Sequence, residues 1–558
     1  MSIKIKGLNY DITGEDTVSV SVSKKNSIAI PEVVIIEKKE YKVTSIVELD
    51  SCKDIIIAQS VTSIGEVSRS ENITIPQSVT SIRDISWSEN ITIPQYVTSI
   101  GTMHGNKNIS IPKSVDLSNI EMFACSKITI DFPKGITRLG KISGLDTVAI
   151  PSSVTTICEL GECKNITIPA SVTKIDILSK CDNINIPSSV KSIEKMTMVH
   201  HVTIPSSVDL TKIEMTDCFD VVIEFPKKIL ILGKISGLEN AKIPSSVTSI
   251  VELNRCKDIT IPKSVLSLEK LSWCKNITIE ASITKIGVLD SCDNIIIPSS
   301  VTSIGALRYC PDFIIPTSVT EIGELSNCTG IVLPKSLKSI GNLNGSKNID
   351  IPESVTSLGV LSCCDNITIP SSITSIGELD RCKNITIPSS VTSIGKLYEY
   401  DAINIPSSVT SIGELICYGG KTIIKSLTSI GTLQGFKNFV VSNKVTSIGS
   451  FNKCQKFSVP EWLDLENIVM SECSDVSINF PKGIEKLGVI SGLDGVEIPS
   501  TVKSIGGLDW CKNIKIPSSV VSIGNLNHCG NIIIPDTVKS IGNIQYSNNI
   551  TIPESFKD

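Results

Sequence analysis

Cysteine is the residue whose number and spacing first suggest chemistry in this chain. Of the 19 cysteines in 558 residues, 16 recur at one place in a short repeated phrase, as at Cys163 and Cys274. Stacked repeats would bring such side chains to about 4.8 Å from one another, which makes a disulfide or metal ladder conceivable. The same column also holds Ser70, Ser346 and Phe436, and no Cys-x-x-Cys occurs. We therefore interpret the column as buried packing and expect no metal and no cofactor.

The residues used in catalysis are few. The chain has 4 histidines, among which His200 and His201 would point to opposite faces of a strand. It contains no Gly-x-Ser-x-Gly, no phosphate-binding loop and no His-Glu-x-x-His. We expect a protein that is not an enzyme.

The most variable positions are the two directly before the cysteine column. Three of the 4 tryptophans lie there, together with several Arg, Tyr and His residues. Trp, Tyr and Arg are enriched at protein interfaces, although a tolerant turn would also explain the variation. Trp273, Arg308 and Tyr309, two repeats apart, could form one patch. As a hypothesis, these three residues bind a protein partner.

These positions belong to an eighteen-residue repeat, seen in IPSSITSIGELDRCKNIT at residues 369–386. The repeat continues through residues 40–558 in about 28 copies, of which three have 21 residues. An unbroken short period predicts a solenoid in place of several globular domains. We expect residues 1–39 to form an amino-terminal cap, with strands in SIKIKG and TVSVSV.

Within one repeat, the inward positions are predicted to be Ile373, Ile376, Leu379, Cys382, Ile385 and Ile387. Only the last pair alternates with the period of a strand, so residues 384–387 are the best predicted strand. A second, shorter extended segment is expected around Val-Thr-Ser-Ile-Gly. No helix fits in the remainder, and the fold class is therefore an all-β repeat solenoid.

Other columns predict turns and close packing. Asn72, Asn165 and Asn384 precede the strand, where an asparagine ladder would fit. A Gly column that includes Gly305 and Gly323 indicates closeness of the coils without a requirement for positive φ. We interpret the Ser and Thr of each repeat as solvated filler. The three 21-residue copies are expected to extend their strands, ITIDF, VVIEF and VSINF, by one alternation.

The repeated phrases INIPSSVTSIG and ITIPSSVTSIG resemble the BspA-like leucine-rich repeat family, as do LNYDITGEDTVSV and IAIPEVVIIEKKEYKVTSI near the amino terminus. The resemblance covers essentially the whole chain and implies a leucine-rich-repeat solenoid. Better-known family members look like surface adhesins or host-interaction proteins of bacteria and of parasitic or amoeboid protists. This chain departs from the family in its repeats, which are shorter by about five residues, and in lacking a visible secretion signal.

One alternative fold stays open. Eighteen residues also equal three hexapeptides, so a left-handed triangular β-helix is the rival of the leucine-rich-repeat solenoid. The inward steps of three favour the leucine-rich-repeat fold, because the β-helix expects a small apolar residue every six positions.

Charge and hydropathy limit the class of partner. Lys and Arg number 52 against 57 Asp and Glu, and the signs are interspersed, which gives no reason to expect nucleic acid. No apolar run has the length of a signal peptide or a membrane span. The expected location is cytoplasmic, with the cell surface or secretion by a non-standard route as the alternative. The last repeat ends on an uncapped strand, which predicts either end-to-end self-association or a short protective loop.

The favoured function is a non-enzymatic interaction or scaffold protein that binds protein partners. A surface adhesin exported without a recognisable signal is the alternative. An ice-binding solenoid is a remote third possibility, suggested by an outward column of threonines at Thr74, Thr167 and Thr386. The identity of the partner cannot be derived from the sequence.

Overall fold

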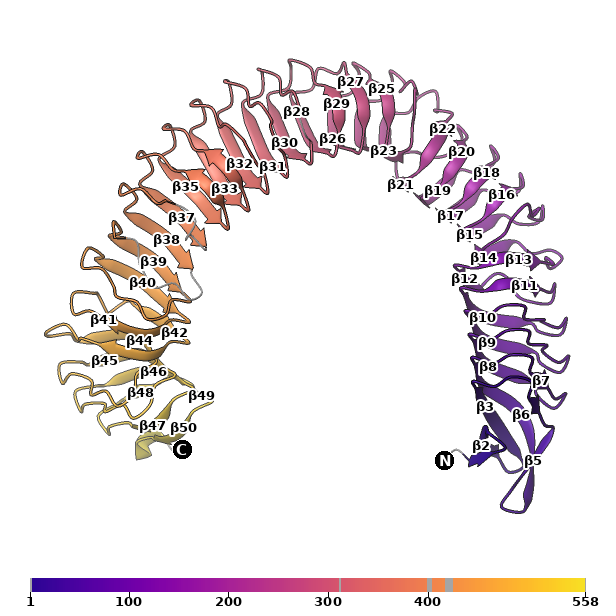
Figure 1. Cartoon of the computed structure of the whole chain (residues 1–558), viewed down its shortest axis with the longest axis horizontal. Coiled ribbons are helices and arrows are strands. Elements are labelled where there is room, and N and C mark those ends of the chain that lie inside the picture. The colour runs from indigo at the N-terminus through magenta and orange to yellow at the C-terminus, as the bar shows by residue number, and fades with distance from the viewer. Residues whose placement is uncertain (1–2, 311–312, 399–403, 417–424, 557–558) are drawn as a thin grey trace. The chain divides into compact units, whose positions relative to one another are not determined.

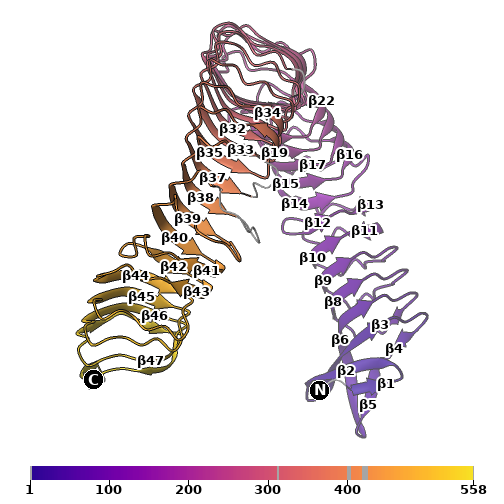
Figure 2. The same ribbon diagram turned by 60° about the vertical axis from the view of Figure 1, so that its left-hand side comes forward.

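The computed structural model describes residues 3–310, 313–398, 404–416 and 425–556. It divides into two units, residues 1–283 with 291–298 and residues 284–290 with 299–558. Asp312, Tyr400 and Cys417, which the sequence places in or beside the columns, lie outside the described residues. Each unit is a stack of β-coils, with the strands of successive coils side by side (Figures 1 and 2).

Each coil contributes one strand to a parallel main sheet, and in most coils this strand has six residues. In the first unit these strands are β6 (Lys39–Asp50), β8 (Ser63–Ser68), β9 (Ser81–Ser86), β10 (Ser99–His104), β12 (Glu121–Phe123), β14 (Arg138–Ser143), β15 (Thr156–Gly161), β17 (Lys174–Ser179), β19 (Ser192–Thr197), β21 (Glu214–Thr216), β23 (Ile231–Ser236), β24 (Ser249–Asn254) and β26 (Ser267–Ser272).

The second unit repeats the pattern. Its main strands are β28 (Lys285–Asp290), β30 (Ser303–Arg308), β31 (Glu321–Ser326), β32 (Ser339–Asn344), β33 (Ser357–Ser362), β35 (Ser375–Asp380), β37 (Ser393–Tyr398), β38 (Ser411–Ile416), β39 (Ser429–Gln434), β40 (Ser447–Asn452), β42 (Val469–Ser471), β44 (Lys486–Ser491), β45 (Ser504–Asp509), β46 (Ser522–Asn527), β48 (Ser540–Ile541) and β49 (Ile544–Gln545).

A second, shorter strand follows in some coils and pairs in small sheets of two to four strands. The first unit has β4 (Ala29–Ile30), β7 (Ile56–Ile57), β11 (Lys107–Ile111), β13 (Ser126–Ile130), β16 (Lys164–Thr167), β18 (Asp182–Asn185), β20 (His200–Ile204), β22 (Phe219–Ile223), β25 (Lys257–Ile261), β27 (Lys275–Ile279) and β29 (Asp293–Ile296). The second unit has β34 (Asp365–Thr368), β36 (Lys383–Thr386), β41 (Gln455–Val459), β43 (Ser474–Ile478), β47 (Gly530–Ile533) and β50 (Asn548–Thr551), and a 3₁₀ turn at Glu554–Phe556 follows.

The prediction was wrong about which of the two strands in a coil is the main one. The main strand of the coil is β35, over Ser375–Asp380, which pairs with β33 and β37, whereas β36 pairs with β34 in a small sheet of the described residues. Ile376 and Leu379 are both buried with two residues between them, so the strand bulges and loses its alternation. A bulged strand escapes a search for period two, because alternation is what that search measures.

The prediction of an all-β leucine-rich-repeat solenoid is confirmed. In the coil of residues 370–387 there are two strands, and the third side is a turn in which Ile373 N donates to Pro370 O at 3.1 Å. The triangular alternative expects three strand faces per coil. All six predicted inward side chains of this coil are buried, with at most 8% exposed.

Glycine allows the coils to approach at the bulge, as predicted. A Cβ added to Gly377 would lie 2.7 Å from the carbonyl oxygen of Gly359 in the preceding coil. Real Cβ atoms do not approach oxygen so closely, and the φ of Gly377 is not positive. Backbone closeness therefore selects glycine here.

Some of the Ser and Thr residues are not solvated filler, although others, such as Ser375 and Thr386, are exposed as expected. Ser390 Oγ donates to Ile373 O of the preceding coil at 2.7 Å, and Thr62 Oγ1 donates to Thr44 O at 3.2 Å. The same serine bond recurs in many coils and satisfies a carbonyl at a corner where no strand pairs. These hydroxyls therefore connect successive coils.

The asparagine ladder is present. Asn90 Nδ2 donates to Asn72 Oδ1 at 3.1 Å, and Asn108 Nδ2 continues to Asn90 Oδ1 at 3.2 Å. These residues have φ between 54° and 57°, a left-handed conformation that Asn tolerates better than most residues. The predicted role in a tight turn is thus accompanied by bonding between coils.

The column cysteines are buried free thiols that form hydrogen bonds to the main chain. Cys382 Sγ donates to Asp380 O at 3.3 Å, with Leu361 O at 3.4 Å. Burial raises the pKa of the Cys125, Cys218 and Cys328 thiols, which keeps them neutral. This arrangement agrees with a packing role.

The 21-residue coils differ from the prediction. Their main strands shrink to three residues in β12, β21 and β42. Asp209 Oδ1 accepts from Thr211 N at 2.9 Å, an Asx turn that replaces the start of the strand. The second strand β13 ends at Ile130, before Asp131, so it gains no alternation.

The amino-terminal segment contains three strands more than expected, β2, β4 and β5. β1 (Ile3–Ile5), β2 (Leu8–Gly14) and β3 (Thr17–Ser23) pair as antiparallel neighbours, and β3 then pairs with β6 in parallel. β5 (Val33–Ile36) adds an antiparallel edge to β6. The predicted strands SIKIKG and TVSVSV thus flank β2, which the sequence analysis did not assign.

Candidate functional site at the left-handed corner

In the coils whose turn lies within the described residues, the residue between the end of the main strand and the turn to the second strand adopts a left-handed conformation, and we call it the corner residue. Corner residues such as Arg255, Trp273, Tyr309 and Trp510 have φ between 49° and 53°. The chain must reverse within two residues between the main strand and the second strand, and this conformation achieves the reversal. The corner N–H still joins the main sheet, since Trp510 N donates to Asn527 O at 2.9 Å.

Large exposed side chains gather at a position that glycine would occupy at lower cost. Trp87, Trp273 and Trp510 are 63%, 58% and 47% exposed. A left-handed conformation costs a residue with a Cβ about 1 kcal/mol. Glycine does occupy the equivalent corner at positions 105, 144, 237, 345, 435 and 492.

Trp87 belongs to the first of three aromatic clusters. Its ring centroid is 5.0 Å from that of His104, which is 6.5 Å from that of Phe123. The ring of Trp87 also covers Gly105, whose added Cβ would meet the ring at 2.5 Å. One face of the Trp87 ring is therefore covered by residues of the following coil.

The second cluster, which we call the arginine corner, consists of Asp217, Phe219, Arg255 and Trp273. Arg255 Nε donates to Asp217 Oδ1 at 2.6 Å, across the coil that contains Gly237. The guanidinium carbon of Arg255 lies 5.1 Å from the ring centroid of Phe219 and 5.4 Å from that of Trp273. The cation is thus held between two rings and a carboxylate.

A buried network supports the arginine corner. Asp217 N donates to Asn254 Oδ1 at 3.4 Å, and Ser236 Oγ donates to the same oxygen at 3.0 Å. Gly237 makes this possible, because a side chain there would collide with the Cys218 carbonyl group. Side chains from two coils, Asp217 and Arg255, therefore meet above the coil between them, because Gly237 has no side chain at its corner.

The third cluster, which we call the tryptophan corner, consists of Glu472, Gly492, Asp509, Trp510 and His528. Trp510 and His528 stack with ring centroids 4.5 Å apart and an interplanar angle of 5°. His528 stacks in turn on the corner residue of the next coil, Tyr546, at 5.0 Å. Burial raises the pKa of Cys511, beside Trp510, to about 12, so no thiolate competes there.

The same buried network recurs below the tryptophan corner, with a carboxylate in it. Glu472 N donates to Asp509 Oδ2 at 2.9 Å, and Ser491 Oγ donates to the same oxygen at 3.3 Å. Asp509 is 9% exposed and replaces the amide of Asn254. Lys453 Nζ approaches Glu472 Oε2 at 3.7 Å.

The predicted trio of Trp273, Arg308 and Tyr309 falls in two different units. Trp273 belongs to the first unit, where it packs against Arg255, and the other two residues belong to the second. Arg308 forms a bidentate pair with Glu324, at 3.0 and 2.6 Å, which raises the pKa of Arg308. Tyr309 is a corner residue and is 57% exposed.

Sequence analysis missed Phe219 and Asp217 as neighbours of Arg255. A signal was available, because residues 208–274 and 463–529 align without a gap and place Asp217 opposite Glu472.

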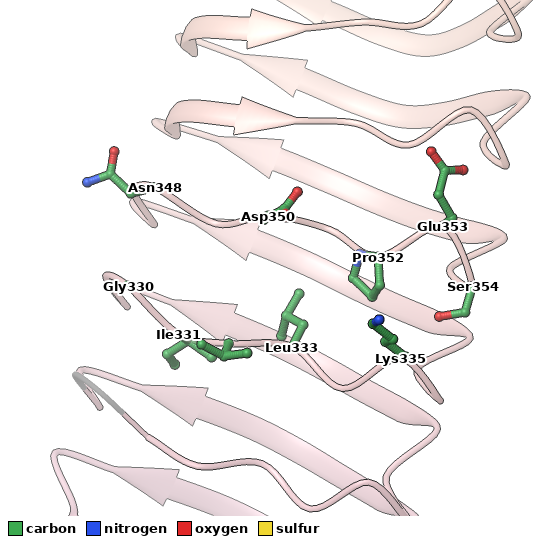
Figure 3. A pocket seen from close by; sticks show the side chains of 10 residues that line it. Gly330, Ile331, Leu333, Lys335, Asn348, Asp350, Pro352, Glu353 and Ser354 are labelled. Atoms are coloured by element: carbon green, nitrogen blue, oxygen red, sulfur yellow. The ribbon is translucent and has the colours of Figure 1, made fainter.

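The outward threonine column is not one continuous surface. The second strand pairs only in short sheets, and at its outward position Ile314 and Val332 are 85% and 80% exposed. Between the coils of Val332 and Asp350 lies a cavity of about 680 Å³, flanked by Lys335 and Glu353 (Figure 3). Its lining mixes both charges with apolar groups and favours no class of ligand.

No group of three or more His, Cys, Asp or Glu side chains is placed to hold a metal ion in the ranges that the structure describes. Within those same ranges, no helix has the length and apolarity needed to cross a membrane.

Comparison with known proteins gives a family match and several structural neighbours. The model of the BspA-type leucine-rich repeat region matches in six copies, within residues 24–104, 48–161 and 490–558. No curated protein matches the chain.

The solved structures that are similar share little sequence. CroV588, described as a novel circular LRR protein, has 14% identity over 96% of this chain and 93% of its own, with a TM-score of 0.32. A leucine-rich repeat protein from Bacteroides ovatus has 16% identity over 70% and 94%, with a TM-score of 0.20. A leucine-rich cell surface protein from Faecalibacterium prausnitzii has 15% identity over 72% and 97%, with a TM-score of 0.17. These TM-scores are below 0.5, and the fold is therefore defined by the strand pairing of this chain alone.

Proposed function

We propose that this chain, which the model of the BspA-type leucine-rich repeat region matches within residues 24–104, 48–161 and 490–558, is a non-enzymatic interaction or scaffold protein whose corner residues bind protein partners. Such solenoids are typical of protein-interaction and surface proteins. One observation carries the proposal. Three tryptophans are 47% to 63% exposed at a backbone position that favours glycine, so packing of the core does not account for them.

Trp273, Arg308 and Tyr309 stay within the proposal as partner-binding residues. Trp273 carries most weight, because Arg255 holds one side of its ring in place and pre-orders it. Arg308 is already paired with Glu324, so it would contribute less than an unpaired arginine.

The test uses substitutions that remove the side chain without straining the backbone. Trp273→Gly and Trp510→Gly place glycine at positive φ, where it is the best tolerated residue, so we expect both variants to fold. The tagged full-length chain and each variant would be used to capture partners from native cells. Loss of specific partners by either variant is the expected result.

The matched control is Trp462→Ser. Trp462 is 50% exposed but lies away from the corner, where its Nε1 donates to Val445 O in place of the usual serine. This variant should keep every partner. Capture of identical proteins by the wild type and by both corner variants would contradict the proposal.

We propose a cytoplasmic location, with a cell-surface adhesin as the alternative. The many buried free thiols suit a reducing compartment. Fractionation of native cells distinguishes the two, since an adhesin must be recovered outside.

Ice binding is a weaker candidate. Isoleucine and valine interrupt the threonine column where such a surface would need to be continuous. A measurement of thermal hysteresis would decide it.

A further inference from the structure

The two duplicated corners differ in what fills the space beside their rings. In the arginine corner the chain supplies its own cation, because Arg255 contacts Asp217 at 2.6 Å and lies against the rings of Phe219 and Trp273. In the aligned segment, Trp510 stands in place of Arg255 and Glu472 in place of Asp217. The acceptor group is therefore kept while the cation is lost.

One face of Trp510 is available. Its other face is covered by His528, at a centroid distance of 4.5 Å with nearly parallel planes. His528 lies in the following coil, so the open face looks toward the preceding coil, whose corner residue is Gly492. Gly492 has no side chain to cover the ring, and Trp510 is 47% exposed.

The charge at this corner is more negative than at the other. Asp509 replaces Asn254 and adds a second carboxylate beside Glu472. Asp509 Oδ2 accepts both of its hydrogen bonds, and no described residue donates to its Oδ1. Lys453 pairs with Glu472 at 3.7 Å while both side chains are more than half exposed, so this pair neutralises little.

We propose that the tryptophan corner binds the guanidinium of an arginine side chain presented by a protein partner, stacked on Trp510 and paired with Glu472. The proposal rests on the proposed function as a protein-interaction solenoid and names the chemistry of one contact. Arg255 shows within this chain what such a corner accommodates. A planar guanidinium suits a flat ring beside carboxylates better than a compact ammonium does.

The test follows the emission of Trp510 in the full-length chain. Trp87, Trp273 and Trp462 would be replaced by Phe, so that Trp510 is the only tryptophan. The probe is the peptide acetyl-Gly-Arg-Gly-amide, compared with the same peptide carrying citrulline or lysine. Citrulline matches the shape of arginine without its charge.

We expect a saturable change with the arginine peptide and about tenfold weaker binding of the citrulline peptide, because charge-assisted contacts would be lost. Lysine should bind with intermediate strength. Glu472→Gln and Asp509→Asn should each weaken arginine binding by roughly three- to tenfold. Equal binding of arginine and citrulline, or no effect of either substitution, would overturn the proposal.

A second measurement uses the duplication itself. Arg255→Ala should open the arginine corner, where Asp217 and Trp273 remain, and raise the number of peptide sites measured by equilibrium dialysis from one to two. An unchanged number would overturn the equivalence on which the proposal stands. Unchanged near-ultraviolet circular dichroism would show that the variants are folded.

Failure of these peptide experiments leaves the capture experiment with Trp273→Gly and Trp510→Gly intact, since that experiment assumes nothing about arginine. The two failures are therefore distinguishable.

Discussion

The arginine corner and the tryptophan corner share a buried framework and differ at the surface. Both have a three-residue strand followed by a coil with glycine at the corner, and in both a Ser hydroxyl and a main-chain N–H meet one oxygen. Above this framework, Arg255 and Asp217 form an ion pair in the arginine corner. The tryptophan corner instead has the ring of Trp510 and the carboxylates of Glu472 and Asp509. The difference teaches that the fold fixes where a corner lies, while a few substitutions, above all Trp510 in place of Arg255, decide whether the corner contains its own guanidinium.

The largest effect should fall on both corners alike. Gly237→Ala and Gly492→Ala would place a Cβ against the carbonyl group of Cys218 or Cys473, at a φ of 79° in each case. We expect a loss of local stability of about 2–4 kcal/mol in each variant, measured by hydrogen exchange at the cysteine amide.

The control is Gly483→Ala. Gly483 also has positive φ, 74°, but an added Cβ would meet nothing within 4 Å. It should lose only about 1 kcal/mol. If one corner glycine behaved like this control, the two frameworks would not be equivalent.

An intermediate effect should separate the corners. Arg255→Ala removes a half-buried ion pair and two ring contacts, so the arginine corner should lose about 1–2 kcal/mol. Trp510→Gly gives up one ring stack but relieves the left-handed strain, so these terms should roughly cancel within about 0.5 kcal/mol. Hydrogen exchange at the Asp217 and Glu472 amides measures both. Equal losses would mean that the tryptophan is structural.

The smallest effect is expected from Asp509→Asn, which gives the tryptophan corner the amide of the arginine corner. The amide oxygen can still accept from Glu472 N and Ser491 Oγ, so stability should change by less than about 0.5 kcal/mol. Thermal unfolding would measure it. A large loss would indicate that the carboxylate itself holds the corner together.

The fold could be predicted from the sequence more fully than the side-chain contacts could. The period and the apolar columns predicted the solenoid and all six inward positions from Ile373 to Ile387, because the same positions are buried in most of the described coils. The strand over Ser375–Asp380 was undervalued because its bulge at Gly377 hides the alternation.

The candidate site was only half predictable. Its position before the cysteine column could be read from variation, which identified Trp273. Its neighbours could not, because Arg255 reaches Asp217 over a coil that glycine leaves open, and spacing alone suggests partners in adjacent repeats. The grouping of Trp273 with Arg308 and Tyr309 stays a prediction.

The hydroxyl bonds from Ser and Thr side chains to main-chain carbonyls of a neighbouring coil run in one direction. Ser390 donates to the coil before it, Thr62 does the same, and the asparagine ladder repeats this direction. A coil gained by duplication therefore arrives with its own donors, finds acceptors already waiting, and offers the same acceptors to its successor. The length of such a protein can change by whole coils without any change in the neighbours, so evolution can adjust the number and spacing of its corners as freely as their residues.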